Sequence, residues 1–239
     1  MLLNYVLVLF LTPVSYRLGV AARKKWMLIA LPVAVVYYPF LVEFQKSPLA
    51  AFALLSFWAV VQSAAVLYVC LRLEPSAITL LTWRGQQYEQ SMFRWIETGA
   101  LPEGDRISVV IFHFRQGVLY CALAIVSANL LSLLLGCALL NYMNCYVAAL
   151  IRRSIRKGYA LWTGWNPWSI VRVFAFLWLG TVCSIPLLWK LGFQVKPLSY
   201  ELLLPGIAGV FLDISLKLVL SPSWSRKLRG NLKTNGITT

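Results

Sequence analysis

Residues 49–71 read LAAFALLSFWAVVQSAAVLYVCL, an apolar run of 23 residues without a single charged side chain. A helix of this length spans roughly 30 Å, the thickness of the hydrocarbon core of a bilayer. Inside lipid the backbone must satisfy its own hydrogen bonds, so the run predicts a transmembrane helix. Pro48 precedes it, at a position where helices commonly begin.

Similar apolar runs lie on both sides of this segment, at 2–20, 26–42, 107–151, 170–191 and 200–220. The 239 residues are 60% hydrophobic and 13% charged, about half the charged share of a soluble domain. We therefore predict an all-α, polytopic transmembrane helical bundle of about 6–7 spans, with the lipid bilayer as its first partner.

The runs divide the chain into four parts. We expect an N-terminal three-span segment (1–71), an extramembrane or interfacial amphipathic segment (72–116), a C-terminal helical bundle (117–220) and a basic tail (221–239) that is disordered. Between Arg84 and Thr98 one helical face carries apolar and aromatic residues, which predicts an interfacial amphipathic helix that Gly99 caps. The apolar side chains of that face are Tyr88, Met92, Trp95 and Ile96.

The stretch 107–151 allows two interpretations. As one helix from Gly117 it would run about 50 Å, which is too long for an upright span. As a hairpin turning near Ser127-Ala128-Asn129 it gives two spans and seven in total, although the turn has neither Gly nor Pro. After it, Asn166 followed by Pro167 predicts the start of another helix.

The distribution of basic residues favours the hairpin. The net charge is +14, from 22 Lys and Arg against 8 Asp and Glu. With seven spans, 19 of the 22 basic residues fall on one side, in clusters at 17–25, 72–115, 152–172 and 217–233. That asymmetry is the positive-inside pattern, so we expect these clusters to be cytoplasmic. Because the basic residues follow the spans, we expect them to attract lipid headgroups, with no direct nucleic-acid binding.

Four polar residues around the amphipathic segment are candidates for acid–base chemistry. They are His113, the only histidine of the chain, with Arg115, Glu103 and Asp105. A histidine and a carboxylate could act on a lipid-linked substrate at the 84–116 surface. The alternative for His113 is an interfacial residue whose ring lies among the headgroups, and we favour it.

Polar residues inside the apolar runs are the second group of candidates. Asp213 lies well inside a run with Lys217 four residues later, a spacing that allows a pair on one helix face. We expect Asp213 to pair with Lys217 or with a neighbouring helix, whereas a transporter could use it as part of an ion path. Asn129, Asn141 and Asn144, and the pair Ser132 and Gly136, are expected to pack helices together.

Several classes of site lack a signature in the sequence. There is no H-E-x-x-H, G-x-S-x-G, P-loop or G-x-G-x-x-G motif. The five cysteines lie in or at the ends of apolar runs without C-x-x-C spacing, which is typical of buried small side chains. We therefore expect no metal, no cofactor and no catalytic residue of a recognisable kind.

The C-terminal half resembles a known family. Residues 149–157, ALIRRSIRK, end a long apolar run, and two further runs and a Lys/Arg tail follow. This R-R-x-x-R-K pattern before a terminal helical hairpin resembles small inner-membrane proteins of integrating conjugative elements and conjugative plasmids, over residues 117–230. Three runs stand in the N-terminal half where that family has one span and an external segment. The resemblance implies DNA-transfer machinery, no catalytic residues and an external position for 72–116.

Three functions remain open from the sequence. Our main hypothesis is a non-enzymatic, multi-pass subunit of a bacterial inner-membrane complex, with other membrane proteins as partners and conjugation as the process. The second is a small membrane enzyme that uses His113 and Arg115 with Glu103 or Asp105. The third is a small transporter that uses Asp213. A cavity joining His113 to a carboxylate would favour the second.

Overall fold

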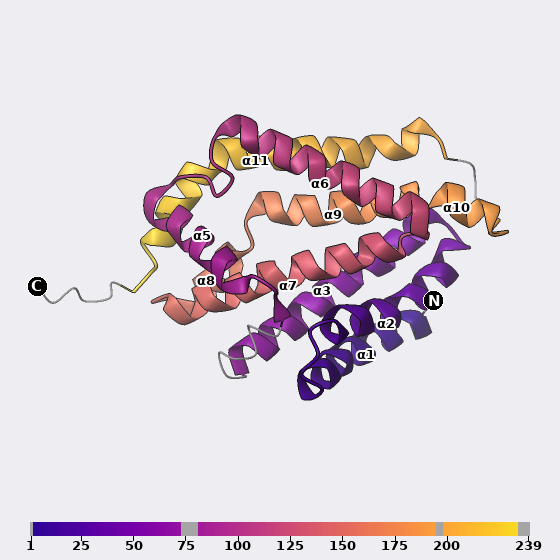
Figure 1. The fold of residues 1–239 in the computed structure, drawn as a ribbon, viewed down its shortest axis with the longest axis horizontal. Helices are drawn as coiled ribbons and strands as arrows, with labels where there is room; N and C mark the ends of the chain where they lie inside the picture. The colour runs from indigo at the N-terminus through magenta and orange to yellow at the C-terminus, as the bar shows by residue number, and fades with distance from the viewer. Residues whose placement is uncertain (1, 73–80, 195–197, 234–239) are drawn as a thin grey trace, which may run out of the picture.

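The computed structural model describes residues 2–72, 81–194 and 198–233. Its long helices run side by side along the molecule (Figure 1). Seven of them are long and apolar enough to cross a membrane. These seven segments are α1 (Leu2–Ala21), α2 (Met27–Phe44), α3 (Pro48–Arg72), α6 (Arg106–Ser127), α7 (Leu130–Arg153), α9 (Pro167–Cys183) with α10 (Ile185–Lys190), and α11 (Tyr200–Arg229). The chain is therefore an all-α, multi-pass membrane protein, as predicted.

The ambiguous stretch 107–151 forms a hairpin of two helices. Ala128 and Asn129 turn the chain, with φ of 49° and 73°, in the left-handed region that Asn tolerates better than most residues. Polar groups stabilise the turn: Ser127 Oγ accepts from Leu131 N at 2.9 Å, and Ser132 Oγ donates to Asn129 Oδ1 at 2.5 Å. Side-chain hydrogen bonds thus make the turn that Gly or Pro would otherwise make.

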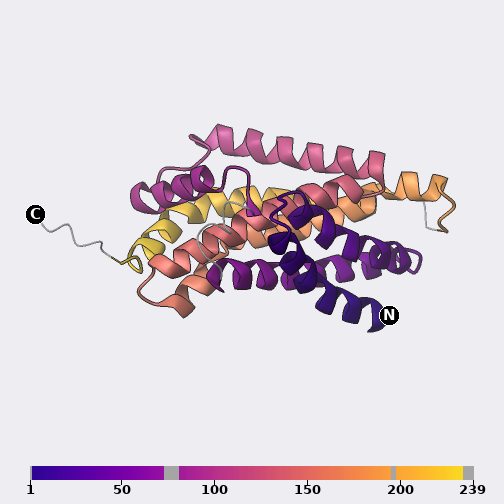
Figure 2. The ribbon, with the colours of Figure 1, turned by 60° about the horizontal axis from the view of Figure 1, so that its bottom comes forward.

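With seven crossings, the four basic clusters fall at one end of the bundle. Figure 1 shows α5 (Gly85–Thr98), α8 (Lys157–Gly164) and the C-terminal end there, and the N-terminus with α10 at the opposite end. Figure 2 shows the same arrangement from a second direction. Lys46 and Lys190 lie at the opposite end, and Lys196 is outside the described residues. Which side of the membrane the basic end faces stays a prediction.

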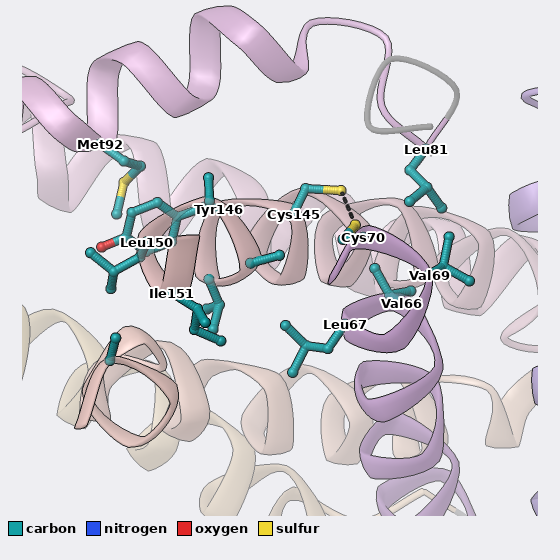
Figure 3. Packing of buried hydrophobic residues seen from close by; sticks show 14 of the residues in the cluster. Val66, Leu67, Val69, Cys70, Leu81, Met92, Cys145, Tyr146, Leu150 and Ile151 are labelled. Atoms are coloured by element: carbon teal, nitrogen blue, oxygen red, sulfur yellow. Dashed lines mark hydrogen bonds between the residues drawn. The ribbon is translucent and has the colours of Figure 1, made fainter. Parts of the chain in front are cut away.

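Helix α5 is amphipathic and packs across the basic end of the bundle. Met92, Phe93, Trp95 and Ile96 are buried, whereas Gln86, Gln87, Gln90 and Arg94 are exposed. Gly99 caps the helix with φ of 78°, and its N–H donates to Trp95 O at 2.8 Å. The predicted cap is therefore present. Figure 3 shows Met92 near Tyr146 and Leu150 of α7, in the cluster that also holds Val66 and Cys70 of α3.

The beginning of the predicted tail is ordered, which corrects our expectation for residues 221–229. Helix α11 continues through Pro222 to Arg229, and Ser221, Ser225 and Leu228 are buried. Beyond the helix, Asn231 Oδ1 accepts from Arg156 N at 3.0 Å, and its Nδ2 donates to Arg156 O at 3.1 Å. These contacts, which are distant in sequence, fix a segment whose polar composition suggested disorder. Residues 234–239 lie outside the described part of the chain.

Candidate functional site

A buried group of charged side chains lies where α6, α9 and α11 meet the loop before α6. We call it the charged cluster, and it consists of Glu103, His113, Arg172, Asp213 and Lys217. The side chain of His113 is fully buried, and those of Asp213 and Lys217 are 1% and 7% exposed. Charged groups are costly to bury unless they are paired. The cluster meets that condition by bringing together four segments of the chain.

Asp213 holds one half of the charged cluster together. Arg172 binds its carboxylate with both arms, Nε at 2.8 Å from Oδ2 and Nη2 at 3.0 Å from Oδ1. His113 Nδ1 lies 3.1 Å from Oδ2. The two-pronged pairing is the geometry for which a guanidinium is suited. It ties α9 to α11 and places the His113 ring against them.

Lys217 forms the other half. Its Nζ lies 2.5 Å from Glu103 Oε1 and 3.4 Å from His113 Nε2. His113 Nε2 also lies 3.9 Å from Glu103 Oε1. With the ammonium donating to Nε2, a neutral ring carries its proton on Nδ1, facing Asp213. The imidazole thus connects an Arg–Asp pair to a Lys–Glu pair.

The charged cluster borders a cavity of 680 Å³ between α6, α7, α9 and α5, which we call the α6–α9 cavity. Its volume falls in the range of pockets that bind small molecules. Glu103, Arg172 and Lys217 of the cluster line it, and His113 lies behind them. Most of the other lining residues are apolar or aromatic, among them Trp58, Met92, Trp95, Phe112, Trp168 and Phe176. The cavity is therefore amphipathic, with charges gathered in part of its wall.

Several polar atoms on the wall of the α6–α9 cavity have no partner among the described residues. They are the hydroxyl of Tyr120, Nε1 of Trp58, Oε1 of Gln116, Oδ1 of Asn166 and Oε2 of Glu103. Tyr120 is 1% exposed and Asn166 is 4% exposed. A buried polar atom without a hydrogen bond costs about 1–3 kcal/mol. Five such atoms belong to residues that line this one cavity.

Glycines make room for the Tyr120 ring. A Cβ on Gly180 would lie 2.8 Å from Tyr120 Cε1, and one on Gly136 would lie 3.3 Å from its hydroxyl. The ring also stacks on Phe176, with centroids 5.1 Å apart. The predicted small-residue spacing of Ser132 and Gly136 thus admits a tyrosine from α6 onto the surface of α7.

The structure separates the four acid–base candidates. Glu103 joins His113 in the charged cluster, and Arg115 lines the cavity. Asp105 takes no part, because it is the N-cap of α6: its Oδ1 accepts from Ser108 N at 2.7 Å. That hydrogen bond lowers the pKa of Asp105. His113 is buried, which corrects our preference for a ring among the headgroups.

The intramembrane polar residues also differ in their roles. Asp213 pairs with Arg172 of a neighbouring helix, while Lys217 pairs with Glu103. Asn141 links three helices: its Oδ1 accepts from Tyr16 Oη at 2.6 Å and from Gln62 Nε2 at 3.3 Å, and its Nδ2 donates to Leu28 O at 3.2 Å. The other two asparagines link fewer helices. Asn144 Nδ2 donates to Ser63 Oγ at 3.0 Å, and its Oδ1 accepts from Trp165 Nε1. Asn129 stabilises the hairpin turn.

Arg172 and Tyr120 are the site residues that sequence reasoning missed. Arg172 lies in the apolar run 170–191, and an ionisable residue inside such a run is a signal for a functional site. We had counted it only as part of a basic cluster. Tyr120 gave no signal, because a tyrosine in an apolar run is ordinary. Asn166 precedes α9 as predicted, but its side chain makes no capping hydrogen bond.

Within the described ranges, no group of three His, Cys, Asp or Glu side chains is placed to hold a metal ion. In the charged cluster, the cationic groups of Arg172 and Lys217 stand where a metal would have to bind the carboxylates. Comparisons of the chain with models of protein families, with curated proteins and with solved structures found no match.

Proposed function

We propose that this multi-pass membrane protein binds one amphiphilic ligand in the α6–α9 cavity. The polar part of the ligand lies against the charged cluster, and its apolar part lies along the aromatic wall. The observation that carries the proposal is the set of unpartnered, buried polar atoms on the cavity wall, Tyr120 Oη above all. The bilayer is the nearest source of such a ligand, since amphiphiles are its main component.

The amphipathic wall supports the proposal on energetic grounds. A hydrocarbon ligand would match the apolar part of the wall. It would leave the polar atoms of Tyr120, Gln116 and Asn166 without hydrogen-bond partners, which costs free energy. A small polar solute would in turn leave the aromatic wall uncovered. An amphiphile satisfies both parts of the wall, as ligands do in pockets that are mostly apolar with a few polar groups.

Tyr120→Phe tests the proposal with little risk to folding. The substitution removes one hydroxyl that has no partner among the described residues, so stability should change by less than about 0.5 kcal/mol. Affinity for a ligand that bonds this hydroxyl should fall about three- to tenfold, the value of one hydrogen bond. The measurement is native mass spectrometry of the purified protein titrated with membrane lipids.

Tyr146→Phe is the matched control. Tyr146 is also 1% exposed with an unpartnered hydroxyl, but it belongs to the cluster between α7, α3 and α5 and not to the cavity lining. We expect ligand binding by this variant to equal that of the wild type. Equal binding by wild type, Tyr120→Phe and Tyr146→Phe would refute the proposal.

A specific observation favours enzymatic conversion of the ligand as a second function. His113 lies 3.1 Å from Asp213 and 3.9 Å from Glu103, and Glu103 lines the cavity. A histidine oriented by a carboxylate is suited to general acid–base catalysis. His113→Ala should then abolish turnover of the lipid that binds, while binding remains. Unchanged turnover would leave His113 as a packing residue. Transport through Asp213 is less favoured, since Arg172 occupies both of its carboxylate oxygens.

Membership in a bacterial inner-membrane complex of conjugative DNA transfer stays a proposal that rests on the resemblance of residues 117–230. The exposed face of α5 is the surface that we would test. Gln90→Lys with Arg94→Glu changes two exposed side chains of that face and leaves the pair of Glu89 with Arg153 intact. Loss of partner proteins from a pull-down of this variant, with normal membrane insertion, would support membership in such a complex. Retention of all partners by this variant would exclude the face as a docking surface.

A further inference from the structure

Arg115 is placed unusually for a cation in a membrane protein. It is the tenth residue of the 22-residue span α6, about 14 Å along the axis from the start of the helix. It lines the α6–α9 cavity and makes no ion pair with any described residue. A charge this far along a span is costly unless it meets water or an opposite charge.

Among the residues that the structure describes, none supplies that opposite charge within the cavity. Four charged residues line it, Glu103, Arg115, Arg172 and Lys217. Arg172 is paired with Asp213, and Lys217 is paired with Glu103. With a neutral His113, the charged cluster therefore balances two positive against two negative groups. Arg115 leaves the cavity with one positive charge.

We infer that the headgroup of the ligand is a phosphate-type anion that pairs with Arg115, an inference that rests on the proposed binding of an amphiphile in this cavity. A guanidinium offers a planar fork of donors that matches two phosphate oxygens. The excess positive charge selects an anion, and the fork favours one with two oxygens, a carboxylate or a phosphate, over a single-point acceptor. Of these two, phosphate is the group that the phospholipids of a bilayer carry. A cationic headgroup could reach Glu103 Oε2, but it would then lie beside the positive groups of Arg115, Arg172 and Lys217, which line the same cavity.

Neighbouring hydroxyl groups complete a donor set for phosphate. Ser108, Tyr120 and Ser169 line the same cavity. So does Tyr88, whose pKa burial raises to about 12, so its phenol keeps its proton and can donate at physiological pH. Hydroxyls and a guanidinium are the usual partners of phosphate oxygens in proteins. The aromatic wall then accepts the apolar remainder of a phospholipid.

The inference can be tested by comparing two lipids that share the same tails. Native mass spectrometry would titrate the protein with dioleoyl phosphatidic acid and with dioleoylglycerol, which lacks the phosphate. We expect the wild type to bind phosphatidic acid about ten- to hundredfold more tightly, the value of a charge-assisted contact. A third titration with inorganic phosphate, added in competition, distinguishes a lipid headgroup from a free phosphate compound. Competition at the concentration at which phosphatidic acid binds would assign the site to a soluble phosphate.

Variants assign the preference to Arg115. Arg115→Gln should remove the discrimination between the two lipids, and Arg115→Lys should keep part of it. Arg94→Gln, which removes an exposed charge on α5 outside the cavity, should leave it unchanged. If Arg115→Gln does not fold, the wild-type comparison and Arg115→Lys still decide the question.

The two proposals fail in different ways. Equal affinity of the wild type for both lipids, with weaker binding of both by Tyr120→Phe, would overturn the anionic headgroup and keep the amphiphile site. Equal affinity with no effect of Tyr120→Phe would overturn both. Discrimination that persists in Arg115→Gln would overturn the role of Arg115 alone.

Discussion

The two halves of the bundle treat buried polar groups differently. In the half formed by α1, α2, α3 and α7, Asn141 of α7 uses its amide on Tyr16, Gln62 and Leu28, and so ties α1, α2 and α3 together. In the other half, α6, α9 and α11 bury full charges, and polar atoms without a partner among the described residues, such as Tyr120 Oη, belong to residues that line a cavity. Atoms without a partner among the described residues occur in both halves, for example Gln62 Oε1 beside Asn141, so it is their gathering on the residues of one cavity wall that indicates a ligand.

Both halves share one end for their basic residues, which gives the prediction with the largest effect. In a background without the five cysteines, Lys24→Cys and Arg94→Cys should react with a membrane-impermeant maleimide only from the cytoplasmic side. Lys190→Cys at the opposite end should react only from outside. All three side chains are exposed, so access depends on the side of the membrane.

Labelling of Arg94→Cys from outside with Lys24→Cys still inside would contradict the seven-span topology. It would also favour the conjugative family, where the segment 72–116 is expected to be external. Labelling of Lys24→Cys and Arg94→Cys together from outside would keep the seven spans and reverse their orientation.

Asp213→Asn should give the largest loss of stability. It leaves Arg172 and His113 without their negative partner inside the protein. Removing one member of a buried ion pair costs about 3–5 kcal/mol, and we expect the lower end because Arg172 is 20% exposed. Reversible unfolding in mixed micelles measures this loss of unfolding free energy. This exceeds the 1–2 kcal/mol of a single hydrogen bond in a helical bundle, which is what a pair within one helix would have implied.

A double-mutant cycle provides the control for Asp213. Arg172→Gln combined with Asp213→Asn should cost less than the sum of the single variants, because the second change removes the stranded charge. Additive losses would show that the two residues act independently, contrary to the two-pronged pairing.

Asn141→Leu tests the other half and should cost about 1–2 kcal/mol. Leu has the same branching at Cγ as Asn and is the larger side chain, so no void forms and the loss reflects the hydrogen bonds to Tyr16 and Leu28. Lipid binding in the α6–α9 cavity should be unaffected. If Asn141→Leu weakened lipid binding as much as Tyr120→Phe does, the proposed division between a structural half and a binding half would be wrong.

Glu89→Gln should have the smallest effect, at most about 1 kcal/mol. Its partner Arg153 lies 2.7 Å away and is 57% exposed, so water screens the pair. Arg153 also lies 4.1 Å from the centre of the Phe93 ring, a contact that the substitution keeps. Unfolding in the same micelles measures it. A loss comparable to that of Asp213→Asn would mean that α5 is held to the bundle by charge and not by its buried apolar face.

The helical membrane class, the positions of most spans and the amphipathic face of α5 could all be predicted from the amino-acid sequence. These depend on run length, hydrophobic periodicity and the distribution of Lys and Arg, which are all local or additive properties. The sequence also indicated His113, Glu103, Asp213 and Lys217 as candidate site residues.

The tertiary structure alone decided how those residues combine. Three features depend on which faces of α6, α9 and α11 meet: the pairing of Asp213 with Arg172, the contact of Glu103 with Lys217 and the place of Tyr120 in the cavity wall. Side chains 41 and 114 residues apart in the chain come into contact there. The same holds for the end of α11, whose order comes from long-range packing. Such contacts depend on which helices pack together, and the spacing of residues within one helix does not identify its partner helix.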